Sequence, residues 1–178
     1  MNRNVFGMNM KHFAFLALLL PLFFSGSLTL FAQDADKAVI AIFPFKNLYG
    51  EEQYESLGWD YADSLEAWLN GQGETGEAYE LISNLDVKDQ MLAQNVDIKS
   101  PSYETDIWTI AEALEADKLI WGTYYVKYNK VFLKVQIIDL SINMPDMDHE
   151  AESKGILYEE GTTSVPDVGA VLLPGLPW

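Results

Sequence analysis

Apolar residues first gather between residues 38 and 69, where their spacing changes along the chain. Residues 39–45 form a short run rich in β-branched and aromatic side chains, which is typical of a buried strand. Asn47 and Gly50 follow and favour a loop, because both residue types accept the backbone angles of tight turns. In residues 57–69, large apolar side chains recur at helical spacing, so this segment predicts an amphipathic helix.

The middle of the chain predicts a second strand and two more helices. Residues 79–82 have the composition of a short strand. Asp86 is expected to cap a helix over residues 87–94, and Thr105 or Asp106 is expected to cap another. The apolar residues that share one face of this last helix are Ile107, Ile110, Ala111 and Leu114.

Between residues 119 and 140 the apolar period falls to two. Two alternating runs flank the polar sequence Tyr128-Asn129-Lys130, and this pattern predicts a β-hairpin. The side chains expected to face the core from the second strand are Val131, Leu133, Val135 and Ile137. The order strand, helix, strand, helix, helix, strand, strand predicts an α/β fold with a single mixed β-sheet packed against helices.

Both ends of the chain are expected to lie outside this domain, which is predicted to span residues 38–143. Residues 1–32 have the pattern of a secretory signal peptide, with basic residues ahead of an apolar core and Ala32 at the cleavage position. An uncleaved membrane anchor is the alternative. Residues 144–178 are expected to form an acidic tail that becomes rich in Gly and Pro, with an edge strand at 150–158 and extended or disordered chain beyond it.

Composition narrows the compartment and the partners. The chain has no Cys, which excludes disulfides and a lipid anchor at the amino terminus. Its net charge is −16, and it becomes −18 without the two basic residues of the leader, since nine basic residues then face 27 acidic ones. Such a chain is not expected to bind nucleic acid or anionic lipid surfaces. The charge is compatible with a basic partner, but a role in solubility alone is the favoured interpretation.

Two blocks of apolar and turn residues carry a family resemblance. The first is VIAIFPFKNLYGEE leading to LGWDYADSLEAWL, which contains Gly58. The second covers residues 110–143 and contains Gly122 and the sequence Ile138-Asp139-Leu140. In order and spacing they resemble the TolB amino-terminal-domain-like family, which is related in fold to CsgG, FlgO and the lipoprotein activators of penicillin-binding proteins.

The resemblance implies the α/β fold of that family and a role in binding and assembly at the cell envelope, without catalysis. It implies envelope proteins as partners, among them outer-membrane proteins and proteins associated with peptidoglycan. This chain departs from the lipoproteins in the group because it has no Cys for lipid attachment.

Residues with catalytic or metal-binding potential are poorly placed for chemistry. Gly71–Gly76 match the dinucleotide motif G-x-G-x-x-G, but a helix is predicted before them instead of a strand, which indicates a flexible connector. His149 is the one His beyond the leader, and no nucleophile elbow accompanies it. The acidic residues between 146 and 152 indicate a solvated turn. No catalytic residue, metal or cofactor is therefore expected.

Three carboxylates on one side of the first predicted helix favour a second function class. Asp60, Asp63 and Glu66 could perform acid–base chemistry, as paired carboxylates do in glycoside hydrolases. Acidic residues near the start of a helix are also a common solvated surface, where they favour the helix dipole. A carboxylate-dependent hydrolase of envelope polymers is therefore an alternative, and a purely structural domain is another.

Two regions are candidate partner-binding surfaces. Trp121 and Tyr125 are predicted on the hairpin face opposite Tyr124, where they form either an exposed patch for a protein or glycan or part of the core. The loop 47–55 follows a strand, and α/β sheets place binding sites at the carboxyl ends of strands. The predicted partner-binding residues are Asn47, Tyr49, Tyr54, Trp121 and Tyr125. We expect an exported, non-enzymatic protein of the periplasm or cell envelope that acts as a protein-binding or assembly accessory module.

Overall fold

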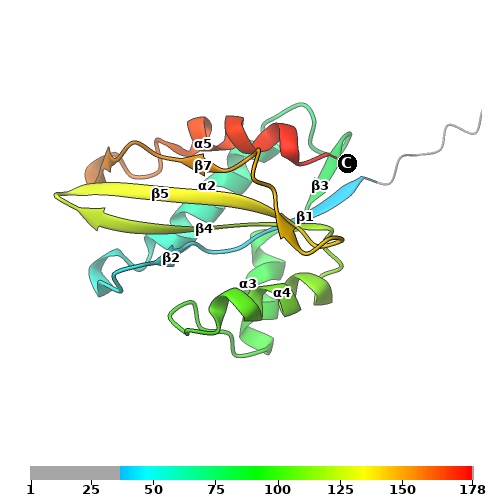
Figure 1. The fold of residues 1–178 in the computed structure, drawn as a ribbon, viewed down its shortest axis with the longest axis horizontal. Helices are drawn as coiled ribbons and strands as arrows, with labels where there is room; N and C mark the ends of the chain where they lie inside the picture. Colours follow the sequence, from blue (N-terminus) through cyan, green and yellow to red (C-terminus); the bar gives the residue numbers. More distant parts are fainter. Residues whose placement is uncertain (1–36, 178) are drawn as a thin grey trace, which may run out of the picture. The chain divides into compact units, whose positions relative to one another are not determined.

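The computed structural model describes residues 37–177, whose backbone forms one mixed β-sheet with helices on both faces (Figure 1). The strands follow the order β3-β1-β4-β5-β6. Their bounds are β1 Ala38–Ile42, β3 Tyr79–Leu81, β4 Lys118–Lys127, β5 Lys130–Asp139 and β6 Met144–Pro145. β1 runs parallel to β3 and β4, whereas β5 is antiparallel to β4. This arrangement confirms the predicted α/β fold.

Three short strands complete the sheet. β2 (Lys46–Asn47) pairs in parallel with β4, and β7 (Ala151–Glu152) and β8 (Ile156–Leu157) pair antiparallel with β5. The edge strand predicted at residues 150–158 therefore exists, but as two pieces. Gly155 lies in the interruption with a φ of +85°, an angle that Gly adopts without steric cost.

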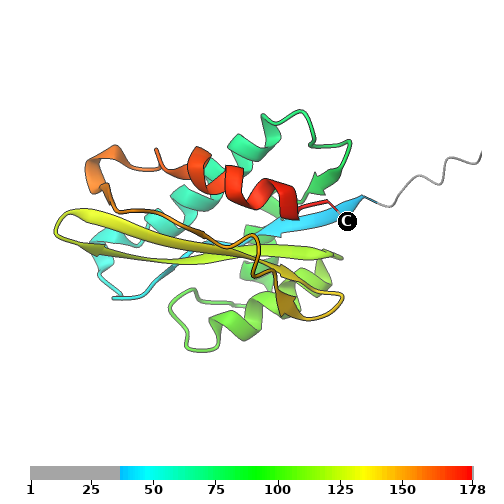
Figure 2. The same ribbon diagram turned by 45° about the horizontal axis from the view of Figure 1, so that its top comes forward.

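Helices cover the sheet from two sides. α2 (Leu57–Asn70) and α5 (Val165–Leu172) lie on one face, and α3 (Asn84–Ala93) and α4 (Tyr103–Ala113) lie on the other (Figure 1, Figure 2). α2 has the predicted amphipathic character, and its buried residues are Leu57, Gly58, Tyr61, Ala62, Leu65 and Leu69. The hairpin residues predicted to face the core, Val131, Leu133, Val135 and Ile137, are buried in the same layer.

Two helices begin earlier than predicted. The cap of α3 is Ser83, whose Oγ accepts a hydrogen bond from the Asp86 N–H at 3.2 Å. α4 begins directly after Ser102, so Thr105 and Asp106 are not its caps. In both helices the acidic residue chosen from the sequence lies in the first turn, where its charge favours the helix dipole without ending the helix.

The prediction of an extended or disordered tail is wrong, and the domain extends to residue 177 instead of ending at 143. Val165, Val168 and Leu172 lie at helical spacing and are buried against the α2 layer. Pro166 does not prevent the helix, because the first turn needs no donor from its backbone. Gly169 permits close packing on α2, since a Cβ there would lie 2.4 Å from the Trp68 ring.

Lys118 fastens the end of the described chain to the sheet. Its Nζ donates to the carbonyl oxygens of Gly175 at 2.9 Å and Pro177 at 2.7 Å. Burial lowers the pKa of Lys118, and the nearby carboxylates of Asp139 and Asp146 oppose that shift. The carboxyl-terminal segment is thus held both by apolar packing and by a buried cation.

The signal peptide and the alternative of an uncleaved membrane anchor are both predicted in the amino-terminal segment. Residues 1–32, the predicted signal peptide, lie outside the described residues. Within residues 37–177, no helix has both the length and the apolar character needed to cross a membrane.

Candidate binding site

The Asn47 side chain holds the loop between β2 and α2 in shape. Its Oδ1 accepts hydrogen bonds from the backbone N–H groups of Tyr49 at 3.1 Å and Gly50 at 3.2 Å. Its Nδ2 donates to the Glu51 carbonyl at 3.1 Å, which closes the loop on itself. Asn47 therefore positions the loop, whereas the Tyr49 side chain is 60% exposed and free to meet a partner.

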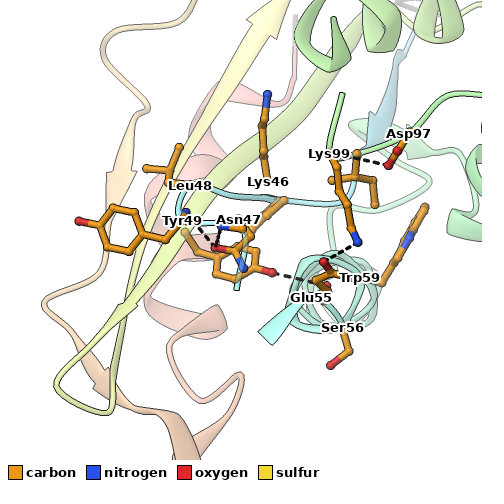
Figure 3. A pocket seen from close by; sticks show the side chains of 13 residues that line it. Lys46, Asn47, Leu48, Tyr49, Glu55, Ser56, Trp59, Asp97 and Lys99 are labelled. Atoms are coloured by element: carbon orange, nitrogen blue, oxygen red, sulfur yellow. Dashed lines mark hydrogen bonds and ion pairs between the residues drawn. The ribbon is translucent and has the colours of Figure 1, made fainter. Parts of the chain in front are cut away.

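A groove of about 580 Å³ opens between this loop, the start of α2 and the loop that precedes α4 (Figure 3). We refer to it as the loop groove, and it is lined by residues 45–50, Glu55, Ser56, Trp59, residues 97–99 and Tyr124. The groove lies beyond the carboxyl end of β1, which is where the fold class favours a binding site. Apolar and aromatic side chains supply much of its wall, so it suits a ligand with apolar groups.

One ion pair spans the loop groove. Lys99 Nζ lies 2.6 Å from Glu55 Oε1, as Figure 3 shows, and this contact raises the pKa of Lys99. The Lys99 backbone N–H also donates to Asp97 Oδ1 at 2.9 Å. Lys99 therefore contacts both carboxylates that line the groove, those of Glu55 and Asp97. Carboxylates held in this way do not suit the acid–base pair of a hydrolase.

Trp59 continues the groove towards α3. Lys88 Nζ lies 4.4 Å from the centroid of its ring, a cation–π distance. A second cavity of about 390 Å³ shares Trp59, Asp97 and Ile98 with the loop groove and extends to Leu92, which is 75% exposed. Trp59 is absent from the residues that the sequence predicts for binding. Its position outside the apolar stripe of the predicted helix nevertheless indicates a large aromatic side chain away from the core.

Tyr49 and Tyr125 meet beside the loop groove. Their ring centroids are 5.3 Å apart, and Tyr125 stacks on Phe132 of β5 at 4.9 Å with an interplanar angle of 10°. Leu48 lines both the loop groove and a smaller hollow of about 200 Å³ that includes Tyr125 and Phe132. The loop and the hairpin, which the sequence offers as separate candidates, therefore form one continuous surface.

The other two predicted binding residues lie elsewhere. Trp121 is 9% exposed and belongs to the core beneath α3 and α4, so it is not part of an exposed patch. Tyr54 is half-buried and packs edge-on against Tyr158, with ring centroids 4.9 Å apart. Its carbonyl accepts the Tyr124 hydroxyl at 2.7 Å. Tyr54 thus anchors the loop to the domain, and it lines neither the loop groove nor the hollow beside Tyr125.

The carboxylates that could support catalysis make structural contacts. Asp63 forms an ion pair with Lys88 at 3.0 Å, and Glu66 accepts the Asn84 N–H at 3.3 Å. These contacts join α2 to α3. They leave the two side chains bound to neighbours on the helix surface, which is not the converging geometry of a glycosidase site.

The acidic segment before β7 holds one His–Asp pair. His149 Nδ1 lies 2.7 Å from Asp146 Oδ2. Burial alone would raise the pKa of Asp146, but hydrogen bonds from His149 and the backbone outweigh it and lower that pKa. Within residues 37–177, no group of three or more His, Cys, Asp or Glu side chains could hold a metal ion.

Comparison with known proteins yields similarity in structure only. No protein-family model matches the sequence, and no curated protein matches it. LpoB from Escherichia coli matches with a TM-score of 0.52 and 11% identity over 68% of this chain, which spans 57% of that LpoB chain. Lipoprotein GNA1162 from Neisseria meningitidis matches with a TM-score of 0.50 and 14% identity over 78% of this chain and 94% of its own. The chain therefore has the fold of these proteins, the TolB amino-terminal-domain-like α/β fold that the sequence predicts.

Proposed function

We propose that this chain is an exported, non-catalytic protein of the periplasm or cell envelope that binds another envelope protein through the loop groove and the aromatic side chains beside it. One observation carries the proposal: the surface runs without interruption from Trp59 through Leu48 to Tyr125. Leu48 and Tyr49 are each more than half exposed at its centre. Contiguous exposed apolar side chains of this kind mark interaction sites.

Three further points support the proposal. The pattern of residues 1–32 favours export. The family resemblance favours envelope proteins as partners, including outer-membrane and peptidoglycan-associated proteins. The engagement of Glu55 and Asp97 by Lys99 favours binding over the alternative of a hydrolase of envelope polymers.

In-cell photo-crosslinking tests the proposal. A photoreactive amino acid in place of Tyr49 is expected to yield a discrete adduct with an envelope protein. The matched control replaces Glu74, an exposed residue in the turn after α2, at the opposite end of that helix from the groove. Leu48→Ser, combined with the Tyr49 probe, is expected to reduce the adduct several-fold. Equal adducts at both positions, or none at Tyr49, would contradict the proposed surface.

A further inference from the structure

No helix of residues 37–177 covers one face of the outer half of the hairpin (Figure 1). α3 and α4 cover this side of the sheet as far as Trp121, and the hairpin continues past them towards its turn (Figure 1). The hairpin residues on the uncovered part alternate with core residues such as Val126 and Val131. We refer to this part as the open half-face, and its residues are Thr123, Tyr125, Lys127, Lys130, Phe132 and Lys134.

The open half-face is basic although the chain is acidic. Four of the nine basic residues in 37–177 lie on it or pair beside it: Lys46, Lys127, Lys130 and Lys134. Glu150, at 2.8 Å, and Glu152, at 3.9 Å, neutralise Lys134, and Glu159 accepts a hydrogen bond from Asn129 in the turn at 3.2 Å. Among the described residues, no carboxylate lies within ion-pair distance of Lys127 or Lys130, the two lysines next to the turn. The positive charge of this face therefore comes from Lys127 and Lys130, and its sign is opposite to that of the net charge of −16.

The contacts of these two lysines within the fold do not offset their mutual repulsion, although Lys127 Nζ lies 5.3 Å from the centroid of the Tyr128 ring. The hairpin register places Lys127 directly opposite Lys130, and like charges in that position destabilise an antiparallel pair. The turn itself does not need them, because its tight geometry depends on Tyr128 and Asn129, whose φ angles are 54° and 58°. An anionic partner between the two ammonium groups would remove the repulsion.

The aromatic contacts indicate what kind of anionic partner fits. Phe132 stacks on one face of the Tyr125 ring, and Tyr49 contacts the same ring at a tilt of 44°, so at least one face of Tyr125 is already occupied. Sugars bind aromatic residues through open ring faces, which disfavours a glycan here. Side chains on alternate residues of β4 are separated by about 6.7 Å, which is also the spacing along one side of an extended peptide.

We infer that the open half-face binds an extended, acidic segment of a polypeptide, with its carboxylates at Lys127 and Lys130 and its apolar side chains at Tyr125 and Phe132. This inference rests on the proposed function, since it names the chemistry of the protein partner. It also differs from the basic partner with which the net charge is compatible, because binding responds to the charge of the contact surface.

The test uses the protein as purified from cells and three labelled probes. One is a short peptide that alternates Glu and Val, the second has Lys in place of each Glu, and the third is an oligogalacturonate. Fluorescence anisotropy is expected to detect binding of the Glu–Val peptide alone, weakened at least tenfold between 50 mM and 500 mM salt because the contact is ionic and exposed.

Lys130→Glu is the decisive variant. It is expected to raise the Kd of the Glu–Val peptide at least tenfold and to raise the Tm as well, because it turns the like-charged pair with Lys127 into an opposite-charged one. A higher Tm excludes unfolding as the reason for lost binding. Lys37→Glu makes the same change in net charge at the start of β1, near Gly76, and is expected to leave the Kd within twofold.

Two results would overturn the inference: a Kd unchanged by Lys130→Glu, or tighter binding of either other probe than of the Glu–Val peptide. If the Tyr49 adduct persists in either case, the proposed function stands and only the partner chemistry is wrong. If the Tyr49 adduct is absent as well, both the proposed function and the inferred partner chemistry are wrong.

Discussion

Trp121 and Tyr125 lie on the same face of β4, four residues apart, in opposite environments. Trp121 is 9% exposed beneath α3 and α4, with no hydrogen-bond partner for its Nε1 among the described residues. Tyr125 is partly exposed. Its ring contacts are with Phe132 of its own hairpin and with Tyr49 of the loop after β2. The difference shows that one face of a strand can belong to the core along one half and be exposed along the other, depending on where the covering helices end.

The strongest test of this comparison is Trp121→Ala. Truncating a buried aromatic side chain leaves a cavity, so the variant is expected to lose about 3–5 kcal/mol of unfolding free energy in urea denaturation. Trp121→Phe keeps an apolar ring and breaks no hydrogen bond, so it is expected to cost much less. A loss under about 1 kcal/mol for the Ala variant would mean that the helices do not seal this half of the face.

Tyr103→Phe tests how the covering helix is attached. The buried Tyr103 hydroxyl, at the start of α4, donates to the Pro44 carbonyl next to β1. Removing it leaves that carbonyl without this donor, and the expected loss of stability is about 1–3 kcal/mol in the same assay. Ile110→Val, further along α4, is the control for a small change that removes no polar contact. Equal stability of Tyr103→Phe and the wild type would contradict this attachment.

The same residue predicts a dependence on alkaline pH. Burial raises the pKa of Tyr103 well above its ordinary value of 10.0, so the folded state keeps the proton after the unfolded state has lost it. Its contribution to stability is complete below pH 10 and is lost as the pH rises towards the folded-state pKa. Burial also raises the pKa of Tyr61, to about 12. Urea denaturation at a series of pH values is therefore expected to show a decline above pH 10 that is shallower, but still present, in Tyr103→Phe.

Tyr125→Ala is expected to have the smallest effect on stability and a clear effect on binding. It removes a stacked pair with Phe132 at a partly exposed site, which is worth about 1 kcal/mol. The photo-crosslink from Tyr49 is expected to fall several-fold, because the ring that supports Tyr49 is gone. A stability loss as large as that of Trp121→Ala would show that the two halves of the face do not differ.

Some residues of the proposed binding surface could be named from the sequence, but not their arrangement. The sequence places Tyr49 and Tyr125 in two separate candidate regions, and only the fold brings their rings to 5.3 Å. Asn47 was selected as a contact residue, but its side chain bonds within the loop and positions it. Trp59 was missed as a wall of the groove, because its partners at residues 97–99 are remote in the sequence.

The error at the carboxyl terminus has a simple cause. Gly and Pro in residues 159–178 favour loop in a local reading, yet Val165, Val168 and Leu172 gain stability by packing on α2. In this segment Gly169 is required for close contact with Trp68, so the residue that argues against a helix allows the helix to pack. Tertiary burial outweighed local propensity there.

By itself, the sequence determined the four main strands β1, β3, β4 and β5, the amphipathic helix α2, and the face on which each hairpin side chain lies. These features depend on periods of 3.6 and two residues, which are local and visible in the chain. Only the tertiary structure decided that Trp121 is covered while Tyr125 is open, and that residues 45–50, Trp59 and residues 97–99 share one groove. Coverage and groove walls depend on where helices from distant parts of the chain end, and no local period records that.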